Sequence, residues 1–243
     1  MSDPFTQPPG RLIALDLART LAIVGMVVFH FTFDLALFGY IPAETIYQPF
    51  WYYFARMVAG SFLFLAGVSL WLAHGQSLRW RAFGWRLAKL VAAAALISIS
   101  SFWLVPGGPI LFGILHSIAL SSLIALAVLR LPWAVTLTLA AGIFALDWVG
   151  QSPRFDGLAL IWLGLAENRP MMGDYVPLIP WAAPCLAGLA LAKAAGLERW
   201  ATRPPSRLMT AFSAPGRHSL VIYLVHQPLL FGLFKAWLWV TGP

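Results

Sequence analysis

The sequence predicts an all-α protein, a polytopic transmembrane helical bundle of about seven spans with its N-terminus in the cytoplasm. Of its 243 residues, 60% are hydrophobic and only 10% are charged, and the mean hydropathy is +0.78. A soluble domain has roughly 45–50% apolar and about 25% charged residues. The composition therefore excludes soluble enzymes, disordered chains and nucleic-acid binders, and the single Cys185 excludes an internal disulfide.

Seven apolar stretches are candidates to cross a bilayer as helices, each of which needs about 20 residues. Within one domain that covers residues 1–243, we expect spans at 12–38, 49–73, 82–105, 111–129, 132–149, 176–192 and 219–240. Glycine and proline residues in the spacers break the helices. A further apolar stretch at 158–165 is too short to cross, so it is either interfacial or re-entrant.

The Lys and Arg residues predict the orientation, because cytoplasmic loops carry the excess of positive charge. If the helices alternate in direction, eleven of the 16 fall on the side of the N-terminus and only Arg154, Arg169 and Lys235 fall on the other. The remaining two, Arg19 and Arg56, lie inside spans. We therefore expect a multi-pass integral membrane protein, with its C-terminus outside the cytoplasm.

The first span contains four ionisable residues, which are Asp16, Arg19, His30 and Asp34. At about 100° per residue they occupy roughly one sixth of the helix circumference, and Arg19 lies about 16 Å from His30 along the axis. A charge in the middle of the bilayer costs about 2.5–3.5 kcal/mol, so this polar stripe is expected to face the protein interior.

The spacing within the stripe allows two interactions. Asp16 and Arg19 are three residues apart and can form an ion pair. His30 and Asp34 are four apart, so the carboxylate can hold one ring nitrogen and leave the other free to act as a general base.

Other spans add ionisable or polar residues that are expected at a similar depth. They are Arg56 in the second span, His116 in the fourth, Asp174 and Tyr175 at the start of the sixth, and His226 in the last. A metal site is not expected, because the histidines lack close ligand spacing and no HExxH or paired-cysteine pattern occurs.

Glycines of the second span predict how that helix packs. Gly60 and Gly67 are nearly two full turns apart, so they share one face of the helix. Small residues in this arrangement allow a neighbouring helix to approach closely.

Five motifs in order along the chain resemble a known family. They are RLIALDLARTLAIVGMVVFHFTFDL, RMVAGSFLFLAGVSL, FGILHSIAL, DYVPLIPWAAPCLAGLALAK and GRHSLVIYLVHQPLL, which start at residues 11, 56, 112, 174 and 216. Together they resemble the bacterial DUF1624 family. That family is related to the catalytic domain of heparan-alpha-glucosaminide N-acetyltransferase and, more distantly, to the membrane acyltransferase 3 enzymes.

The resemblance implies a transmembrane acyl-CoA-dependent acyltransferase of the bacterial inner membrane. Such enzymes move an acyl group, here expected to be acetyl, from cytoplasmic acyl-CoA to an acceptor on the far side, such as a sugar amine or hydroxyl. The motif residues fall on Arg19, His30, Arg56 and His116. The lysosomal enzyme has more helices and a polar amide in place of His30, so its catalytic assignment does not carry over directly to this chain.

The resemblance and the stripe together suggest roles for individual residues. His30, oriented by Asp34, is expected to act as general base or to carry the acyl group, and Arg56 or His116 to stabilise the oxyanion. We expect CoA to be bound by Arg19, Arg79, Arg81 and Arg203, and the acceptor by Asp174, Tyr175 and His226. The expected partners are acyl-CoA, an extracytoplasmic glycan or other small acceptor, and the lipid bilayer, with no metal and no nucleic acid. The sequence leaves open whether the protein forms a homodimer.

A small-solute or proton-coupled transporter is the alternative, with the polar stripe as its path. It would show flux across a membrane without hydrolysis of acyl-CoA. A retinal protein needs a lysine in the middle of the last helix, whereas Lys235 lies near the outer end of that helix.

Overall fold

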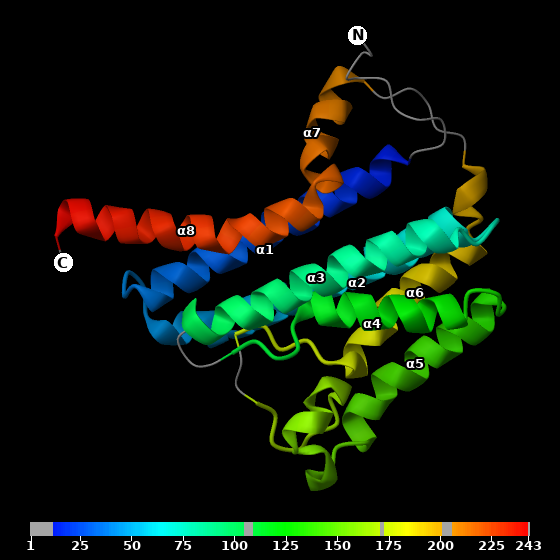
Figure 1. The fold of residues 1–243 in the computed structure, drawn as a ribbon, viewed down its shortest axis with the longest axis horizontal. Helices are drawn as coiled ribbons and strands as arrows, with labels where there is room; N and C mark the ends of the chain where they lie inside the picture. The colour runs from blue at the N-terminus through cyan, green and yellow to red at the C-terminus, as the bar shows by residue number, and fades with distance from the viewer. Residues whose placement is uncertain (1–11, 105–108, 171–172, 201–205, 243) are drawn as a thin grey trace. The chain divides into compact units, whose positions relative to one another are not determined.

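The computed structural model describes residues 12–104, 109–170, 173–200 and 206–242 (Figure 1). These residues form eight α-helices and four short 3-10 helices. In the described ranges, β-pairing is limited to one isolated bridge between Ser152 and Ala166. The all-α class is therefore confirmed for this part of the chain. The residues fall into two compact units, 12–59 with 206–242, and 60–200.

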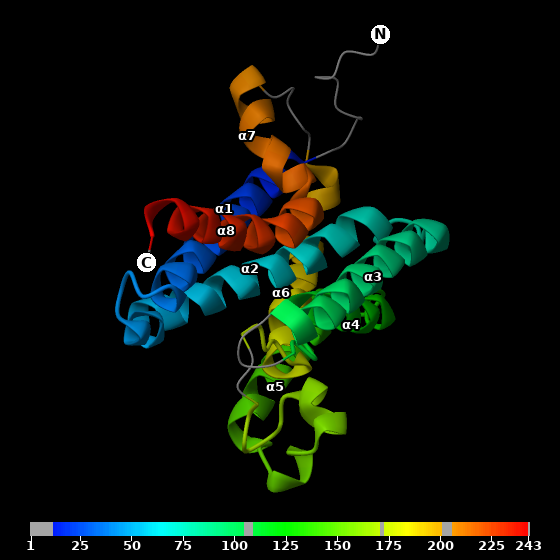
Figure 2. The same cartoon turned by 60° about the vertical axis from the view of Figure 1, so that its left-hand side comes forward.

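Unit 1 brings the two ends of the described chain together. It contains α1 (Ile13–Leu37), η1 (Ala43–Tyr47), the start of α2 (Pro49–His74), α7 (Arg207–Arg217) and α8 (Ser219–Thr241). Both α7 and α8 pack against α1, and α7 lies at its N-terminal end (Figure 2). The first predicted span and the last thus lie side by side.

Aromatic rings and a glycine fix the two contacts of α1. The ring of Phe38 lies 5.2 Å from those of Phe231 and Phe234 on α8, measured between centroids. At the other end, a Cβ on Gly216 of α7 would lie 1.9 Å from the carbonyl oxygen of Asp16. Only glycine therefore allows the backbones of α7 and α1 to approach so closely.

Unit 2 contains the rest of α2 and four further α-helices. These are α3 (Trp80–Leu104), α4 (Ile114–Ala127), α5 (Trp133–Val149) and α6 (Leu178–Ala194), together with η2 (Pro153–Phe155), η3 (Leu158–Leu163) and η4 (Leu197–Arg199). Helix α6 packs on both α4 and α5, and α4 also packs on α3. Helix α6 is thus the centre of the unit, and Cys185, Leu186 and Leu189 on it are almost fully buried.

Four helices are long and apolar enough to cross a membrane: α1, α2, α8 and residues 80–103 of α3. Helix α4 has 14 residues, and α5 and α6 have 17 each. At 1.5 Å per residue they measure about 21 and 25 Å, less than the roughly 30 Å core of a bilayer. The total of seven spans and the orientation stay predictions.

Two differences from the expected elements have clear local reasons. The stretch 111–129 is shortened at its N-terminal end, because α4 begins only after Gly113, which has an extended backbone. Helix α7 was not expected at all. Its 11 residues place polar side chains on one face and apolar side chains on the other. A search for continuous apolar stretches therefore does not detect it.

The segment between α5 and α6 is ordered by side-chain hydrogen bonds. The Asp156 carboxylate accepts hydrogen bonds from the backbone of Glu167 and from both the backbone and side chain of Asn168, which lowers the pKa of Asp156. The 158–165 stretch contains η3, in which Leu158 is 72% exposed and Ile161 is buried. Whether it is interfacial or re-entrant stays open.

Helices α2 and α6 cross with their backbones in contact. A Cβ on Gly67 would lie 1.9 Å from the carbonyl oxygen of Cys185, and one on Gly188 would lie 2.1 Å from that of Phe64. Each helix thus contributes a glycine to the crossing, as in close helix pairs of membrane proteins. The close packing expected at Gly67 is confirmed.

We predict that Gly67→Ala will destabilise the protein, because the new methyl group must push two helix backbones apart. Overpacking of this kind costs about 1–3 kcal/mol. The measurement is the thermal unfolding midpoint in detergent, followed by tryptophan fluorescence. Gly142→Ala on α5 is the control, since nothing lies within 4 Å of a Cβ there, and it should not lower the midpoint. Equal midpoints for both variants would contradict the crossing.

Candidate functional site

The polar stripe of α1 lies on the protected face of the helix. Asp16 and Asp34 are 1% and 0% exposed. The other side carries the exposed apolar residues Leu21, Val24 and Val28. This division is the one that a membrane helix needs, with apolar side chains toward lipid and ionisable ones toward protein.

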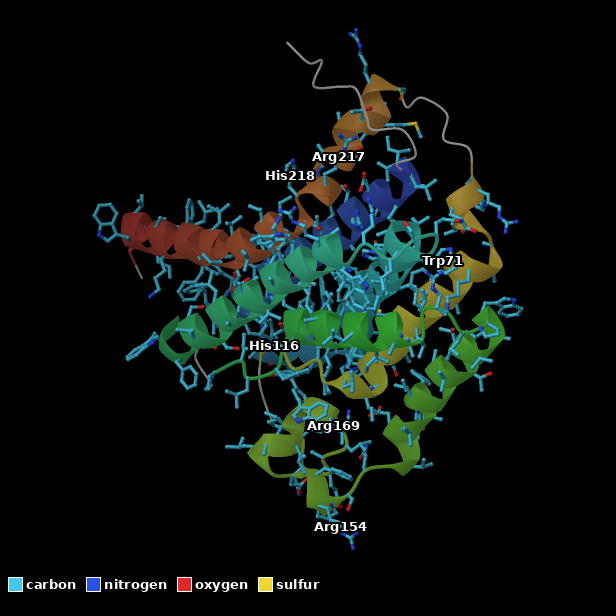
Figure 3. The ribbon with its side chains drawn as sticks, turned by 45° about the vertical axis from the view of Figure 1, so that its right-hand side comes forward. Trp71, His116, Arg154, Arg169, Arg217 and His218 are labelled. Atoms are coloured by element: carbon cyan, nitrogen blue, oxygen red, sulfur yellow. The ribbon has the colours of Figure 1, made fainter. Side chains whose placement is uncertain are left out.

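An ion-pair cluster lies at the N-terminal end of the stripe. The Asp16 carboxylate is 3.0 Å from Nη1 of Arg19, as the spacing predicted, and 3.8 Å from Nε of Arg217. Arg217 ends α7 beside the first turns of α1 (Figure 3). The backbone N–H of Gly216 donates to the Thr20 hydroxyl at 2.9 Å. One buried carboxylate is thus shared by two arginines from different helices.

Two histidines meet further along α1 and α8. The ring centroids of His30 and His226 are 4.8 Å apart, in an edge-on arrangement. Nδ1 of His226 lies 2.7 Å from the carbonyl oxygen of Tyr223. A carbonyl can only accept, so in the neutral imidazole Nδ1 carries the proton and Nε2 keeps its lone pair. That Nε2 atom is buried and has no hydrogen-bond partner among the described residues.

Asp34 interacts with α8 and not with His30 as expected. Its Oδ1 accepts a hydrogen bond of 2.8 Å from Nε2 of Gln227. Its Oδ2 and the Gln227 Oε1 are buried and have no hydrogen-bond partner in the described part of the chain. The amide of α8 lies across from the carboxylate and takes the place that the local spacing assigned to the imidazole.

Arg56 lies on α2 within unit 1. Its guanidinium stacks 4.2 Å from the centroid of the Tyr52 ring, one turn earlier on the same helix. This cation–π contact keeps the charge of Arg56 at the aromatic end of α2.

His116 lies at the N-terminus of α4, within unit 2 (Figure 3). Its Nδ1 accepts a hydrogen bond from the backbone N–H of Gly113 at 3.2 Å, and its Nε2 is 3.4 Å from the hydroxyl of Ser98. Asp174 caps the same helix end, since its Oδ2 accepts from the N–H of Ile114 at 3.2 Å. Both ring nitrogens of His116 are thus engaged near the start of α4.

Tyr175 also takes part in a structural contact. Its hydroxyl donates to the carbonyl oxygen of Ile161 at 2.6 Å, and burial raises the pKa of this phenol. Asp147 at the end of α5 forms an ion pair with Arg169 (Figure 3). These contacts tie the segment after α5 to the residues that lead into α6.

The residues expected to bind CoA are only partly described. Arg79 is exposed, and its Nε donates to the carbonyl oxygen of Ala73 at 3.2 Å. Arg81 is exposed at the start of α3. Arg203 lies outside the described residues. Arg19 is bound to Asp16, so part of its charge is already neutralised inside the protein.

The expected site residues are distributed over the two units. Unit 1 holds Arg19, His30, Asp34, Arg56 and His226, and unit 2 holds Arg79, Arg81, His116, Asp174 and Tyr175. Within unit 1 the structure brings His30 to His226, and it brings Asp34 to Gln227. Among the described residues, no three His, Cys, Asp or Glu side chains gather as metal ligands.

Sequence reasoning missed several residues that connect helices. Lys193 on α6 donates to the carbonyl oxygens of Val128 and Leu131 and to the Thr136 hydroxyl, at 3.1–3.2 Å. The role of Lys193 is seen only from its contacts with another part of the chain. In the sequence, Lys193 is only one of the positive charges that indicate topology. The signal available for Gln227 was its position next to His226, on a span that otherwise holds few polar residues.

A tryptophan is involved in a similar connection at the end of α2. The indole N–H of Trp71 donates to Oε2 of Glu198 at 2.7 Å (Figure 3). This hydrogen bond lowers the pKa of Glu198. It ties α2 to η4 within unit 2.

Comparison with known families identifies the chain. The model of the family described as heparan-alpha-glucosaminide N-acetyltransferase, catalytic, matches residues 11–228. The chain belongs to this family. The family match and the four long apolar helices together show that the chain is an integral membrane protein of an acetyltransferase family. No curated protein and no solved structure matches the chain.

We predict that Asp16→Asn will destabilise the protein, because Arg19 and Arg217 lose the carboxylate that neutralises them. Breaking a buried pair costs about 3–5 kcal/mol, and about 1–3 kcal/mol is expected here because both arginines are partly exposed. The measurement is again the thermal midpoint in detergent. Glu44→Gln, at an exposed acid of the same unit, should leave the midpoint unchanged. A wild-type midpoint for Asp16→Asn would show that the cluster adds no stability.

Proposed function

We propose that the protein is a membrane acetyltransferase that moves an acetyl group from cytoplasmic acetyl-CoA to an amine or hydroxyl of an extracytoplasmic glycan. The observation that carries this proposal is the family match over residues 11–228. The buried polar stripe of α1 supports it, because ionisable residues within a membrane helix are costly and commonly mark a path or a reaction site.

We further propose seven spans with the N-terminus in the cytoplasm, in the bacterial inner membrane. The four long apolar helices and the one-sided distribution of Lys and Arg support this arrangement. In this orientation, the Asp16 end of α1 faces the cytoplasm and the His30 end lies in the outer half of the bilayer.

His30 is the proposed reacting group. In one route, the acceptor nitrogen or oxygen attacks the thioester carbonyl, His30 takes the proton of the acceptor, the C–S bond breaks, and the CoA thiolate leaves and is then protonated. In the other, an unprotonated nitrogen of His30 attacks the thioester carbonyl, the C–S bond breaks, and CoA leaves as the thiolate, which is then protonated. The acceptor next takes the acetyl group from His30 and gives up its proton to Nε2 of His226.

The neighbours of His30 in unit 1 support both routes. His226 is fixed by its hydrogen bond to Tyr223 and keeps an unshared lone pair beside His30, where it can receive a proton. Asp34 holds Gln227, the neighbour of His226 on α8, and is proposed to position the histidine pair through this hydrogen bond. The hydrogen bonds of His116, Asp174 and Tyr175 suit positioning roles better than proton transfer.

The phosphates of CoA are proposed to bind exposed basic residues on the cytoplasmic side. Arg79 and Arg81 are exposed and positively charged, which suits charge-assisted contacts to phosphate. Arg203 is kept in this proposal on sequence grounds. Arg56 is proposed to stabilise the oxyanion, for which a guanidinium is suited.

We predict that His30→Ala will lower acetyl transfer about 10²–10⁴-fold, the usual contribution of a general base. The measurement is release of CoA thiol and transfer of labelled acetyl to glycan acceptors, in proteoliposomes of known protein orientation. His218→Ala is the control, since this exposed histidine of unit 1 is assigned no part in the reaction. A well-inserted His30→Ala with the full rate would exclude the proposed role. Solute flux without thiol release would favour the transporter.

The two routes differ in one intermediate. If His30 carries the acetyl group, protein mixed with acetyl-CoA and no acceptor will show acetylation of the peptide that contains His30 by mass spectrometry. If His30 is a general base, this peptide stays unmodified while transfer to an added acceptor proceeds.

We predict that Gln227→Leu will lower kcat about tenfold and leave KM for acetyl-CoA nearly unchanged. The variant deprives the buried Asp34 carboxylate of its amide partner, next to the histidine pair, and does not touch the basic residues proposed for CoA. A misplacement of about 1 Å can cost more than this in rate. Gln48→Leu, at an exposed glutamine of unit 1, should leave both constants unchanged. A change in KM alone would exclude the positioning role.

A further inference from the structure

Helix α7 has an unusual distribution of side chains around its axis. Thr210, Ser213 and Gly216 are buried, and the helix contacts α1 through Gly216. The large apolar residues are on the outside, where Leu208 is 66% and Phe212 is 60% exposed. The helix thus packs on the protein with small and polar residues and presents its apolar side outward.

The exposed residues Leu208 and Phe212 are four apart, and the half-buried Pro215 follows three residues later. This spacing places all three on one side of the helix. This side is turned by about 130° from the buried residues, at about 100° per residue. Arg207 is in the first turn, about 100° around the axis from Leu208 and two turns before Ala214. The helix begins at the Ser206 cap, whose hydroxyl accepts from the N–H of Met209.

The length of α7 excludes a membrane span. Its 11 residues rise about 16 Å, roughly half of a bilayer core. A short amphipathic helix with a separate apolar face and a basic residue near it is typical of helices that lie in the membrane interface.

The neighbours of α7 place it at that interface. His218 is the one residue between α7 and the candidate span α8, and Gly216 contacts α1, a second candidate span, within a turn of its start. A helix joined to one membrane segment and packed on the first turn of another lies at the depth where both leave the bilayer.

We propose that α7 docks on the cytoplasmic leaflet, with Leu208 and Phe212 between lipid chains and Arg207 among anionic headgroups. Such leaflets carry negative charge that attracts basic residues. Arg217 is not part of this contact, because it binds Asp16. The side of the membrane follows from the orientation proposed above, whereas the docking itself does not depend on the reaction.

Cysteine labelling of the full chain in lipid nanodiscs tests the proposal. Leu208→Cys, Phe212→Cys and Ala214→Cys each receive a fluorescent label, and Ala214 is the matched exposed control away from the apolar face. The unmutated chain, whose single Cys185 is buried, gives the background labelling. Iodide quenches labels in water, and lipids brominated near the headgroup quench labels in the interface.

We expect the labels at 208 and 212 to be quenched at least twofold more by the brominated lipid than the label at 214, and iodide to show the reverse order. In discs of zwitterionic lipid, or with Arg207→Gln, the lipid quenching at 208 should weaken.

Equal iodide quenching at all three positions would place the apolar face in water and overturn the proposal. Protection of 208 and 212 from both quenchers would mean that protein covers the face, which would also overturn it. If quenching at 208 does not change with lipid charge or with Arg207→Gln, the proposed contact between Arg207 and anionic headgroups is wrong.

Discussion

The cost of placing ionisable groups in a membrane governs unit 1. Helix α1 is long and apolar enough to cross a bilayer, yet it carries two nearly fully buried carboxylates. Lipid cannot solvate such groups, so other parts of the protein must. Asp16 is neutralised by arginines from α1 and α7, and one oxygen of Asp34 accepts a hydrogen bond from an amide of α8. The packing of α7 and α8 on α1 thus follows from the needs of two carboxylates.

The polar groups along the stripe are not equally well paired. At one end of the stripe, charge is balanced by charge, which suits a structural anchor. Further along, the polar atoms are only half satisfied, because Asp34 Oδ2, Gln227 Oε1 and His226 Nε2 are buried without a hydrogen bond in the described chain. Native proteins leave few such atoms. Three of them on two facing helices support the proposal that the reaction takes place in this layer, where a substrate would supply the missing partners.

The sequence predicted much of this arrangement, and its failures have physical causes. Apolar stretches located seven of the eight α-helices, and the helical period placed Asp16, Arg19 and Asp34 on one protected face. The same reasoning assigned Asp34 to His30, because spacing along one helix cannot reveal an amide on another. It missed α7, whose apolar residues cover only one side, and it could not assign Lys193 to the carbonyl oxygens of Val128 and Leu131.

The corner between α7 and α8 has a mechanical consequence. His218 closes α7 by donating its N–H to the carbonyl oxygen of Pro215 at 3.0 Å, and its own carbonyl accepts from the N–H of Ile222 at 3.1 Å. Both helix ends are thus held by the backbone of a single residue, which leaves no linker between α7 and α8. A helix lying flat along the bilayer surface would in this way set the tilt of the next helix, and with it the depth at which His226 meets His30.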